Sequence, residues 1–227
     1  MPFPDLAERV SEVRGRIDVA AARGGHGQAV RLVAVTKGHG PEAVDAAAAV
    51  GLGDVGENRV QEALQKMAKV TAQVRWHLIG HLQRNKVKWL DPFHIVHSLD
   101  SPRLADAVHE FGASRGRPVD ALVQVNIVGE SSKGGFSPPE VEREAERLEG
   151  LSGLRVVGVM AMAPFDADER TLRAVFGGAR QARDVLAAAG HPAAELSMGM
   201  SNDFEVAVEE GATLVRLGTV LFGARAA

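Results

Sequence analysis

Eight short segments rich in valine, leucine and isoleucine recur along the chain, and segments with helical character separate them. Several of the eight are apolar at consecutive positions, which is typical of strands buried on both faces of a parallel sheet. The segments that we expect to form strands are 31–37, 52–58, 74–80, 93–100, 120–129, 155–162, 194–200 and 213–219. This alternation leaves few folds open to the chain.

The segments between the strands carry the signals of helices. Residues 41–50, for example, open with Pro41, which suits the first turn of a helix, and end before Gly51. Asn202 and, three positions later, Glu205 form a capping-box pattern at the start of another segment. The expected helices are 41–50, 59–73, 101–115, 137–149, 168–189 and 202–210.

Eight strands alternating with helices predict an α/β fold, a single (β/α)8 TIM-type barrel with an extra N-terminal helix. An open doubly wound sheet is the alternative, but eight similar strands without a break in composition favour closure. Only eight residues follow the last expected strand, so the usual final outer helix is missing. The amphipathic segment 5–23 is expected to cover that gap. Without a linker or a low-complexity stretch, we expect one domain over residues 1–227.

Composition excludes several classes of function. Cysteine is absent, which excludes disulfides, thiolate metal sites and a cysteine nucleophile. A net charge of −3 gives no electrostatic reason to expect nucleic acid or an anionic membrane as a partner. The charged N-terminus does not resemble a signal peptide, and no stretch of about 18 apolar residues predicts a membrane span. We therefore expect a cytoplasmic protein.

Histidine is frequent enough to raise the question of a bound metal. His94 and His97 lie on one expected strand, an odd number of residues apart. Because side chains alternate along a strand, this spacing places the two rings on opposite faces. We therefore expect no metal site.

Functional groups of a (β/α)8 barrel lie at the C-terminal ends of its strands. Lys37 follows the first expected strand, where apolar walls would lower the pKa of its amine and free it to attack a carbonyl as a Schiff-base lysine. The alternative is a lysine that only faces solvent at a strand end.

Small residues after the last two strands predict a phosphate site. Ser201 and Asn202 follow the seventh strand, and Gly218 and Thr219 follow the eighth. Turns of this kind leave backbone N–H groups to face an anion, although Ser201 and Asn202 taken alone could be a simple helix cap. The first and eighth strands of a closed barrel are neighbours, so the Lys37 amine and the phosphate site are expected to lie close together. A small phosphorylated aldehyde would fit both. Pyridoxal 5′-phosphate (PLP) is the candidate.

Seven motifs, in order and over nearly the whole chain, resemble those of one family. They are AVTK (34–37), GENRVQE (56–62), WHLIGHLQRNK (76–86), HSLDS (97–101), VNIVGESSKGGF (125–136), VGVMAM (157–162) and LSMGMSNDFEVAVEEGATLVRLGTVLFG (196–223). The family is that of the YggS/PROSC pyridoxal phosphate homeostasis proteins, which are similar in fold to the barrel domain of alanine racemase. The resemblance implies a protein that binds PLP without an established reaction.

The resemblance also implies roles for single residues. Lys37 would be the Schiff-base lysine, and Arg216 would face the pyridine nitrogen. Ser201, Gly218 and Thr219 would hold the phosphate, and Asn58 and Met200 would line the ring pocket. The expected cofactor-binding residues are Lys37, Asn58, His77, Met200, Ser201, Arg216, Gly218 and Thr219, with no catalytic residue among them. The chain departs from the family pattern at 38–40, where Gly-His-Gly follows the lysine, and at Arg59, where an aromatic residue is frequent. These departures put contacts at the rim of the pocket in doubt.

The missing tyrosine argues against racemisation. A two-base racemase needs a second acid–base group opposite the lysine, which is a tyrosine in the racemases, and this chain contains none. Arginine only donates hydrogen bonds and does not protonate the pyridine nitrogen, which makes the ring a weaker electron sink. We therefore expect a carrier in intracellular PLP homeostasis, acting as a monomer that passes PLP to PLP-dependent apo-enzymes. Lys133, in a glycine-rich loop, is a candidate for assisting release, or a solvated lysine.

Two enzyme hypotheses remain as alternatives. The first is a PLP-dependent amino-acid racemase or decarboxylase of weak activity, in which His77 or His81 replaces the tyrosine. The second is a lysine aldolase that acts on a sugar phosphate without a cofactor, using the same amine and phosphate cradle.

Overall fold

The computed structural model describes residues 3–130 and 134–223, and these form a closed barrel of eight parallel strands. Neighbouring strands pair in chain order, and β8 pairs with β1 to close the barrel. The strands are β1 (Arg31–Val35), β2 (Asp54–Glu57), β3 (Arg75–Leu78), β4 (Phe93–Leu99), β5 (Val119–Val125), β6 (Leu154–Ala161), β7 (Glu195–Ser197) and β8 (Leu214–Leu217). The predicted (β/α)8 barrel is confirmed, and the open sheet is excluded.

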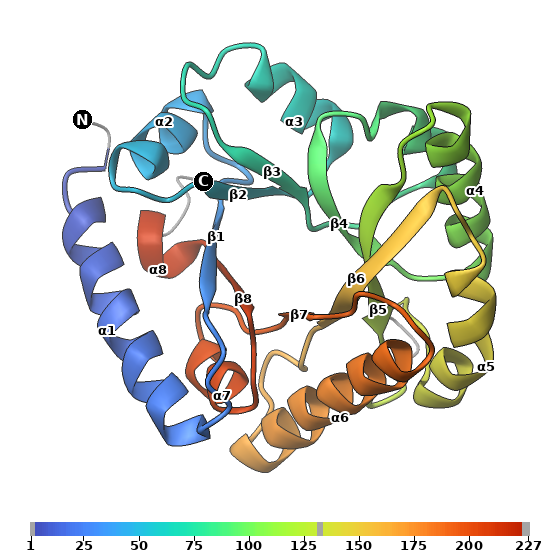
Figure 1. Cartoon of the computed structure of the whole chain (residues 1–227). Coiled ribbons are helices and arrows are strands. Elements are labelled where there is room, and N and C mark those ends of the chain that lie inside the picture. Colours follow the sequence, from blue (N-terminus) through green and yellow to red (C-terminus); the bar gives the residue numbers. More distant parts are fainter. Residues whose placement is uncertain (1–2, 131–133, 224–227) are drawn as a thin grey trace.

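Helices surround the barrel, as Figure 1 shows in a view along its axis. They are α1 (Leu6–Gly24), α2 (Pro41–Ala49), α3 (Val60–Met67), α4 (Pro102–Ser114), α5 (Pro138–Glu149), α6 (Glu169–Ala188), α7 (Phe204–Glu209) and α8 (Thr219–Phe222). A 3-10 helix, η1 (Arg84–Trp89), connects β3 and β4. Each predicted helix is present, and the short α8 stands where no helix was predicted. No helix in the described part of the chain is long and apolar enough to cross a membrane.

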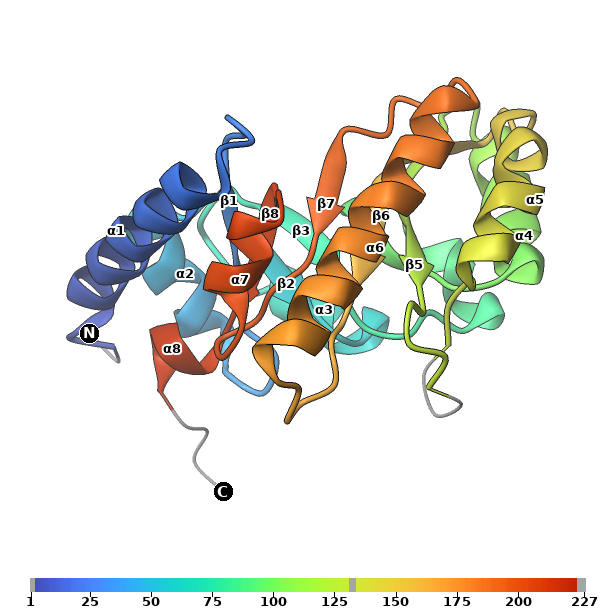
Figure 2. The same cartoon turned by 90° about the horizontal axis from the view of Figure 1, so that it is seen from below.

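The extra N-terminal helix covers the gap beside β8. Its buried residues are Leu6, Val10, Val13, Ile17 and Ala20, the stripe expected from the sequence. Arg16 on this helix binds Glu205 on α7 through two hydrogen bonds of 3.2 and 3.0 Å. Arg9 donates to the carbonyl of Leu221 on α8 at 3.2 Å. In both views α1 lies on the side of the barrel formed by α7 and α8 (Figures 1 and 2). The predicted role of this helix is confirmed.

Buried apolar side chains form an inner and an outer core. The inner core fills the barrel and comprises Val33, Ile95, Leu122, Met160 and Leu214. The outer core lies between strands and helices and includes Leu32 and Ala34 of β1. Because strand residues alternate between the two sides, the side that holds Val33 also takes positions 35 and 37. The alternation in β1 therefore favours the barrel interior for position 37.

The predicted capping box at Asn202 and Glu205 is wrong. α7 begins at Phe204, and Asn202 is exposed in the preceding turn. The carboxylate of Asp203 instead accepts a hydrogen bond from the backbone of Met200 at 2.5 Å. The Glu205 carboxylate is engaged by Arg16 of α1 and does not turn back to its own helix. A tertiary ion pair has overridden the local pattern.

A capping box is present at the start of α5 instead. The backbone N–H of Ser137 donates to Glu140 Oε2 at 2.8 Å, and the Ser137 hydroxyl reaches the same oxygen at 2.7 Å. Pro138 at the first helical position has no N–H that would need a partner. Local chemistry therefore fixes where α5 begins.

Candidate functional site

Lys37 lies in a tight turn at the end of β1. Backbone pairing with β2 extends to Thr36, whose N–H donates to Gly56 O at 3.1 Å. The N–H of His39 then donates back to Thr36 O, also at 3.1 Å, and closes the turn. Gly38 has a φ of 77°, a left-handed conformation that glycine adopts without strain. The Gly-His-Gly departure from the family pattern is thus compatible with a turn that presents a half-buried lysine.

A buried ion pair supports this turn from the helix side. Glu57 is fully buried, and Lys66 of α3 is 8% exposed. Lys66 Nζ pairs with Glu57 Oε1 and also donates to the carbonyl of Thr36 at 2.8 Å. The Thr36 hydroxyl donates to the same carboxylate oxygen at 2.6 Å. The residue that precedes Lys37 is therefore held through its hydroxyl and its carbonyl.

Sequence reasoning missed this ion pair. Glu57 belongs to the GENRVQE motif, in which the sequence assigns a binding role only to Asn58. A lysine seven residues into a helical segment reads as a surface residue, so only the helix orientation identifies Lys66 as a partner.

The loops after β7 and β8 meet at the predicted phosphate site. The N–H of Val220 lies 3.4 Å from the Ser201 hydroxyl oxygen, which joins the two loops. α8 starts at Thr219, and the N–H groups of Leu221 and Phe222 both donate to Gly218 O at 2.9 Å. Ser201 and Gly218 are half-buried, and Thr219 is exposed. The structure thus brings the three predicted phosphate residues together.

The phosphate loops lie against the strand that leads to Lys37. A Cβ added to Gly218 would be 3.4 Å from both Cβ and the carbonyl oxygen of Val35. This close approach follows from the direct pairing of β1 with β8. The predicted amine and the predicted cradle are therefore neighbours at one end of the barrel.

The two residues expected to contact the cofactor ring also lie at strand ends. Met200 follows β7 and is half-buried, just after Gly199, whose φ of 92° makes the turn. Asn58 follows β2 and is half-buried. A Cβ on Gly80, after β3, would lie 2.3 Å from the carbonyl oxygen of Asn58, so these two loops touch.

Arg216 lies beneath the phosphate loops and is 5% exposed. Its Nη1 donates to the carbonyl and the hydroxyl of Ser197, both at 2.6 Å, and its Nη2 donates to the carbonyl of Ala161 at 3.0 Å. Burial lowers the pKa of Arg216 to about 10, although the charge of Asp203 acts in the opposite direction. The guanidinium has no ion pair with a carboxylate of the described residues.

This geometry fits a ligand that carries a hydrogen-bond acceptor. A buried guanidinium is stable only when its N–H groups find acceptors. The three bonds of Arg216 use three of its five N–H donors. A pyridine nitrogen is such an acceptor, and the phosphate loops lie next to Arg216 at the same end of the barrel. The residues present are therefore compatible with PLP.

His77 lies inside the barrel and is fully buried. Its Nε2 is 2.8 Å from Asp54 Oδ1, and its Nδ1 is 2.9 Å from Nε2 of His97. His97 Nδ1 is in turn 2.8 Å from the hydroxyl of Ser197, the residue that binds Arg216. Both ring nitrogens of His77 are thus engaged within the barrel, and His77 reaches Arg216 only through other side chains.

Hydrogen bonding and burial together set the charges of this group. Burial pushes the pKa of Asp54 upward, but hydrogen bonds from His77 and Arg75 outweigh it and hold that pKa well below its usual value. Burial is the main cause that holds the pKa of His97 well below 6.5, and the nearby charge of Arg216 acts in the same direction. Asp54 is therefore ionised and His97 neutral at physiological pH.

The expected separation of His94 and His97 is wrong. Both rings contact His77 edge-on, with centroid distances of 5.6 and 5.1 Å. Pairing of β3 with β4 shifts register between Trp76 and His77, so simple alternation does not describe this strand. Within residues 3–130 and 134–223, no cluster of three or more potential ligands could hold a metal ion.

The other candidate side chains lie at the rim or outside the described residues. The His81 ring is exposed after β3, with Nδ1 3.0 Å from Asp100 Oδ2. Lys133, the candidate for assisting release, lies outside the described residues.

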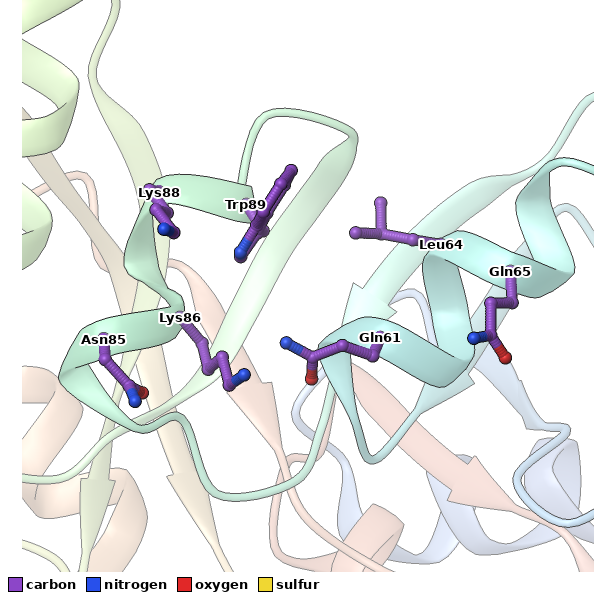
Figure 3. Close-up of a pocket in the computed structure, with 7 residues that line it drawn as sticks. All are labelled: Gln61, Leu64, Gln65, Asn85, Lys86, Lys88 and Trp89. Atoms are coloured by element: carbon purple, nitrogen blue, oxygen red, sulfur yellow. The ribbon is translucent and has the colours of Figure 1, made fainter.

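A cavity of about 540 Å³ lies on the outer surface, between α3 and η1 (Figure 3). Gln61 and Lys86 extend toward one another across it, and Leu64 on α3 faces Trp89 on η1. A second cavity, of about 400 Å³, includes Asn58 and His81 and shares Gln61 and Lys86 with the first. The larger cavity thus lies beside the barrel mouth and contains none of the predicted site residues.

Comparison with known proteins identifies relatives over nearly the whole chain. The family described as "Alanine racemase, N-terminal domain" matches residues 10–226. The pyridoxal phosphate homeostasis protein of Aquifex aeolicus is 41% identical over 225 residues, covering 97% of this chain and 99% of the relative. The Escherichia coli K12 protein of the same name is 35% identical over 232 residues, covering 97% of each chain.

Solved structures show the same architecture. PipY of Synechococcus elongatus with PLP bound has a TM-score of 0.85 at 35% identity, covering 96% of this chain and 100% of PipY. The same protein without PLP gives a TM-score of 0.86. Alanine racemase from Corynebacterium glutamicum gives 0.71 at 17% identity, covering 96% of this chain but 61% of the racemase, a likeness of fold alone.

Proposed function

The chain belongs to the pyridoxal phosphate homeostasis protein family, within the alanine racemase N-terminal domain fold, and from that premise we propose that it is a reversible carrier of PLP. The observation that carries the proposal is the meeting of Lys37, the phosphate loops and the buried Arg216 at one end of the barrel. The carrier acts in the cytoplasm as a monomer and passes PLP to PLP-dependent apo-enzymes. PipY, which has been solved with PLP bound, supports the assignment of the ligand.

The predicted residues at the strand ends have defined tasks in the carrier. Lys37 Nζ would attack the aldehyde carbon of the ligand in a condensation that releases one water and that hydrolysis reverses. Ser201 donates its hydroxyl to the phosphate, while the backbone N–H groups at Gly218 and Thr219 face it. Asn58 and Met200 border the ring. When bound, PLP supplies an electrophilic aldehyde and a pyridine ring that can withdraw electrons.

Arg216 favours storage over catalysis. With a pKa of about 10 the guanidinium stays protonated at neutral pH, so it donates a hydrogen bond to the pyridine nitrogen and does not transfer a proton. An unprotonated ring withdraws electrons weakly, which disfavours carbanion chemistry on an amino acid. The arrangement holds the ligand without activating it strongly.

The side chains that could act as a second base also favour a carrier over a racemase. Tyrosine is absent from the chain, and His77 uses both ring nitrogens inside the barrel. His81 is at the rim and is bound to Asp100. An amino-acid racemase or decarboxylase of weak activity, with His81 as the second base, remains the alternative function.

A PLP titration tests the proposal. Adding PLP to the ligand-free protein should produce a visible absorption band, and Lys37→Ala should abolish it. Lys86→Ala, which removes a half-buried lysine beside the mouth, is the matched control and should keep the band. An unchanged band in Lys37→Ala would overturn the proposal. No band with PLP in the wild type, together with sugar-phosphate cleavage, would favour the aldolase.

Isotope exchange separates the carrier from an enzyme. The PLP-loaded protein is mixed with single amino-acid enantiomers in D₂O, and deuterium at Cα is measured by NMR. The carrier should show no exchange at ordinary enzymic rates of about 1–10³ s⁻¹. Exchange at such rates that is lost in His81→Gln would establish the racemase alternative.

A further inference from the structure

A continuous file of hydrogen-bonded polar side chains crosses the inside of the barrel, and all of them except the exposed Arg75 at its start are buried. Its members are Arg75, Asp54, His77, His97, Ser197 and Arg216, each hydrogen-bonded to the next at 2.9 Å or less. Asp54 and Arg75 are the first residues of β2 and β3, whereas Arg216 is near the end of β8. The file therefore connects one end of the barrel to the end that carries Lys37.

Folding alone does not call for this file. Branched apolar side chains ordinarily fill the interior of a (β/α)8 barrel. Burying polar groups is unfavourable unless each finds a partner, and well-packed apolar replacements are often neutral or stabilising. A file of satisfied polar groups in place of such residues points to a role beyond stability.

The donors and acceptors of the file run in one direction. Asp54 is ionised and accepts the proton on His77 Nε2. His77 Nδ1 then accepts from His97 Nε2–H, which leaves His97 Nδ1 to accept from the Ser197 hydroxyl. With its own proton committed to His97, the Ser197 oxygen presents lone pairs to Arg216, which can only donate.

The opposite direction is inconsistent with the same contacts. A proton on His97 Nδ1 would point at the Ser197 oxygen together with the N–H groups of Arg216. The Ser197 hydroxyl proton would then have no acceptor in the file. His97 Nε2 would also need a proton from His77, which would have to carry protons on both ring nitrogens.

We propose that His77 and His97 are positioning residues that act through Ser197 to hold the Arg216 guanidinium toward the pyridine nitrogen of the ligand. This inference rests on the proposed PLP-binding function. It adds a means of fixing the buried contact between Arg216 and the pyridine nitrogen. Asp54 anchors the direction of the file, and Arg75 holds Asp54 with two hydrogen bonds of 2.8 and 2.6 Å. Loss of any link frees the Ser197 hydroxyl to rotate and weakens the hold on Arg216.

Histidine tautomers in the PLP-free protein provide the first test. Long-range ¹H–¹⁵N NMR spectra should show both His77 and His97 with the proton on Nε2 and none on Nδ1. Spectra of Ser197→Ala should show a shifted His97 Nδ1 resonance, because that nitrogen loses its donor. A proton on Nδ1 of His97 in the wild type would overturn the inference, whatever the outcome of PLP binding.

PLP affinity and the absorption of bound PLP provide the second test. Ser197→Ala removes one hydroxyl and keeps the backbone carbonyl that also binds Arg216, so this variant should fold. We expect PLP to bind about tenfold more weakly, with a shifted absorption band and Lys37 still attached. Ser197→Thr, which restores a hydroxyl, should recover most of the affinity and the original band.

A matched control separates positioning from packing. Met160→Leu changes an inner-core side chain that is outside the file, and it should leave affinity and band unchanged. His97→Phe should match Ser197→Ala in both readouts. Unchanged affinity and band in Ser197→Ala, with Lys37 still carrying PLP, would overturn the positioning role and leave the carrier proposal intact. Failure of Lys37 to bind PLP would overturn the carrier proposal, while the tautomer test would still stand.

Discussion

Glu57 and Lys66 show how a single residue pair can set the position of the reactive lysine. Their ion pair is almost fully buried and binds the hydroxyl and the carbonyl of Thr36, next to Lys37. Breaking a buried pair by removing one partner leaves a charge without compensation, which costs about 3–5 kcal/mol. The pair therefore supports both stability and the geometry of the turn.

Lys66→Met tests this pair. We expect the free energy of unfolding to fall by about 3 kcal/mol or more, because Glu57 would remain buried without its partner. Urea unfolding at pH 7 measures the change. The control Lys86→Met alters a surface lysine and should stay within about 0.5 kcal/mol of the wild type. Equal stabilities of the two variants would show that the pair contributes little.

His97 should make stability depend on pH. In the folded protein burial holds its pKa well below 6.5, so it stays neutral, whereas the unfolded chain binds a proton below about pH 6.5. Stability should therefore fall as the pH is lowered from about 6.5 to 5, by up to about 1.4 kcal/mol per pH unit for this group. His94, whose pKa burial also lowers, adds in the same direction.

Replacing His97 isolates its share of that slope. Urea unfolding is measured between about pH 5 and 6.5, because this interval lies above the pH range in which most carboxylates titrate. His97→Gln should show a shallower loss of stability than the wild type over this interval. An identical slope in both proteins would mean that His97 is not held neutral in the fold.

The positions of individual site residues were predictable only where a local sequence motif indicated them. Ser201, Gly218 and Thr219 are brought together as expected, because small residues after β7 and β8 carry their own turn chemistry. The partners of His77 were not predictable, since Asp54 and His97, and Ser197 beyond His97, meet inside the barrel from three other strands. Only the register of the closed sheet brings them together.

At the scale of elements, the apolar runs predicted which strands exist but not where they end. The segment 194–200 was expected to be a strand throughout, yet β7 ends at Ser197. Gly199 leaves the extended conformation with a φ of 92°, and a Cβ there would lie 2.7 Å from that of Ala207. The end of this strand is thus set by packing against α7, which the run itself does not encode.

Helix starts provide a paired test of local and tertiary control. Ser137→Ala should lower the free energy of unfolding by about 1 kcal/mol, because it removes the hydroxyl of a formed capping box. Asn202→Ala should change it by less than about 0.5 kcal/mol, since Asn202 caps no helix here. Thermal and urea unfolding of the two variants measure both values. A larger loss in Asn202→Ala would mean that the sequence pattern, and not the structure, describes α7 correctly.

At the scale of the whole molecule, the candidate site depends on barrel closure. Lys37 follows β1 and the phosphate loops follow β7 and β8, so residues from opposite ends of the sequence meet only when β8 pairs with β1. α1 covers the side of the barrel where β8 meets β1, and it packs on α7 and α8. Folding and formation of the site are therefore expected to be one event.

Unfolding and sedimentation test this unity. We expect one cooperative thermal transition and a sedimenting species of one 24.0 kDa chain. PLP should raise the midpoint, because it binds the closed barrel and not the unfolded chain. Two separate transitions, or a stable dimer that dissociates on loss of α1, would contradict the expectation of one self-contained domain.

Borohydride trapping tests whether PLP binds covalently to Lys37. Reduction of the PLP-loaded protein converts an imine into a stable secondary amine, and a peptide mass spectrum then locates the attached pyridoxyl group. We expect the added mass on the peptide containing Lys37 and its absence from Lys37→Ala. A pyridoxyl group found only on another lysine, Lys133 included, or no adduct at all, would contradict it.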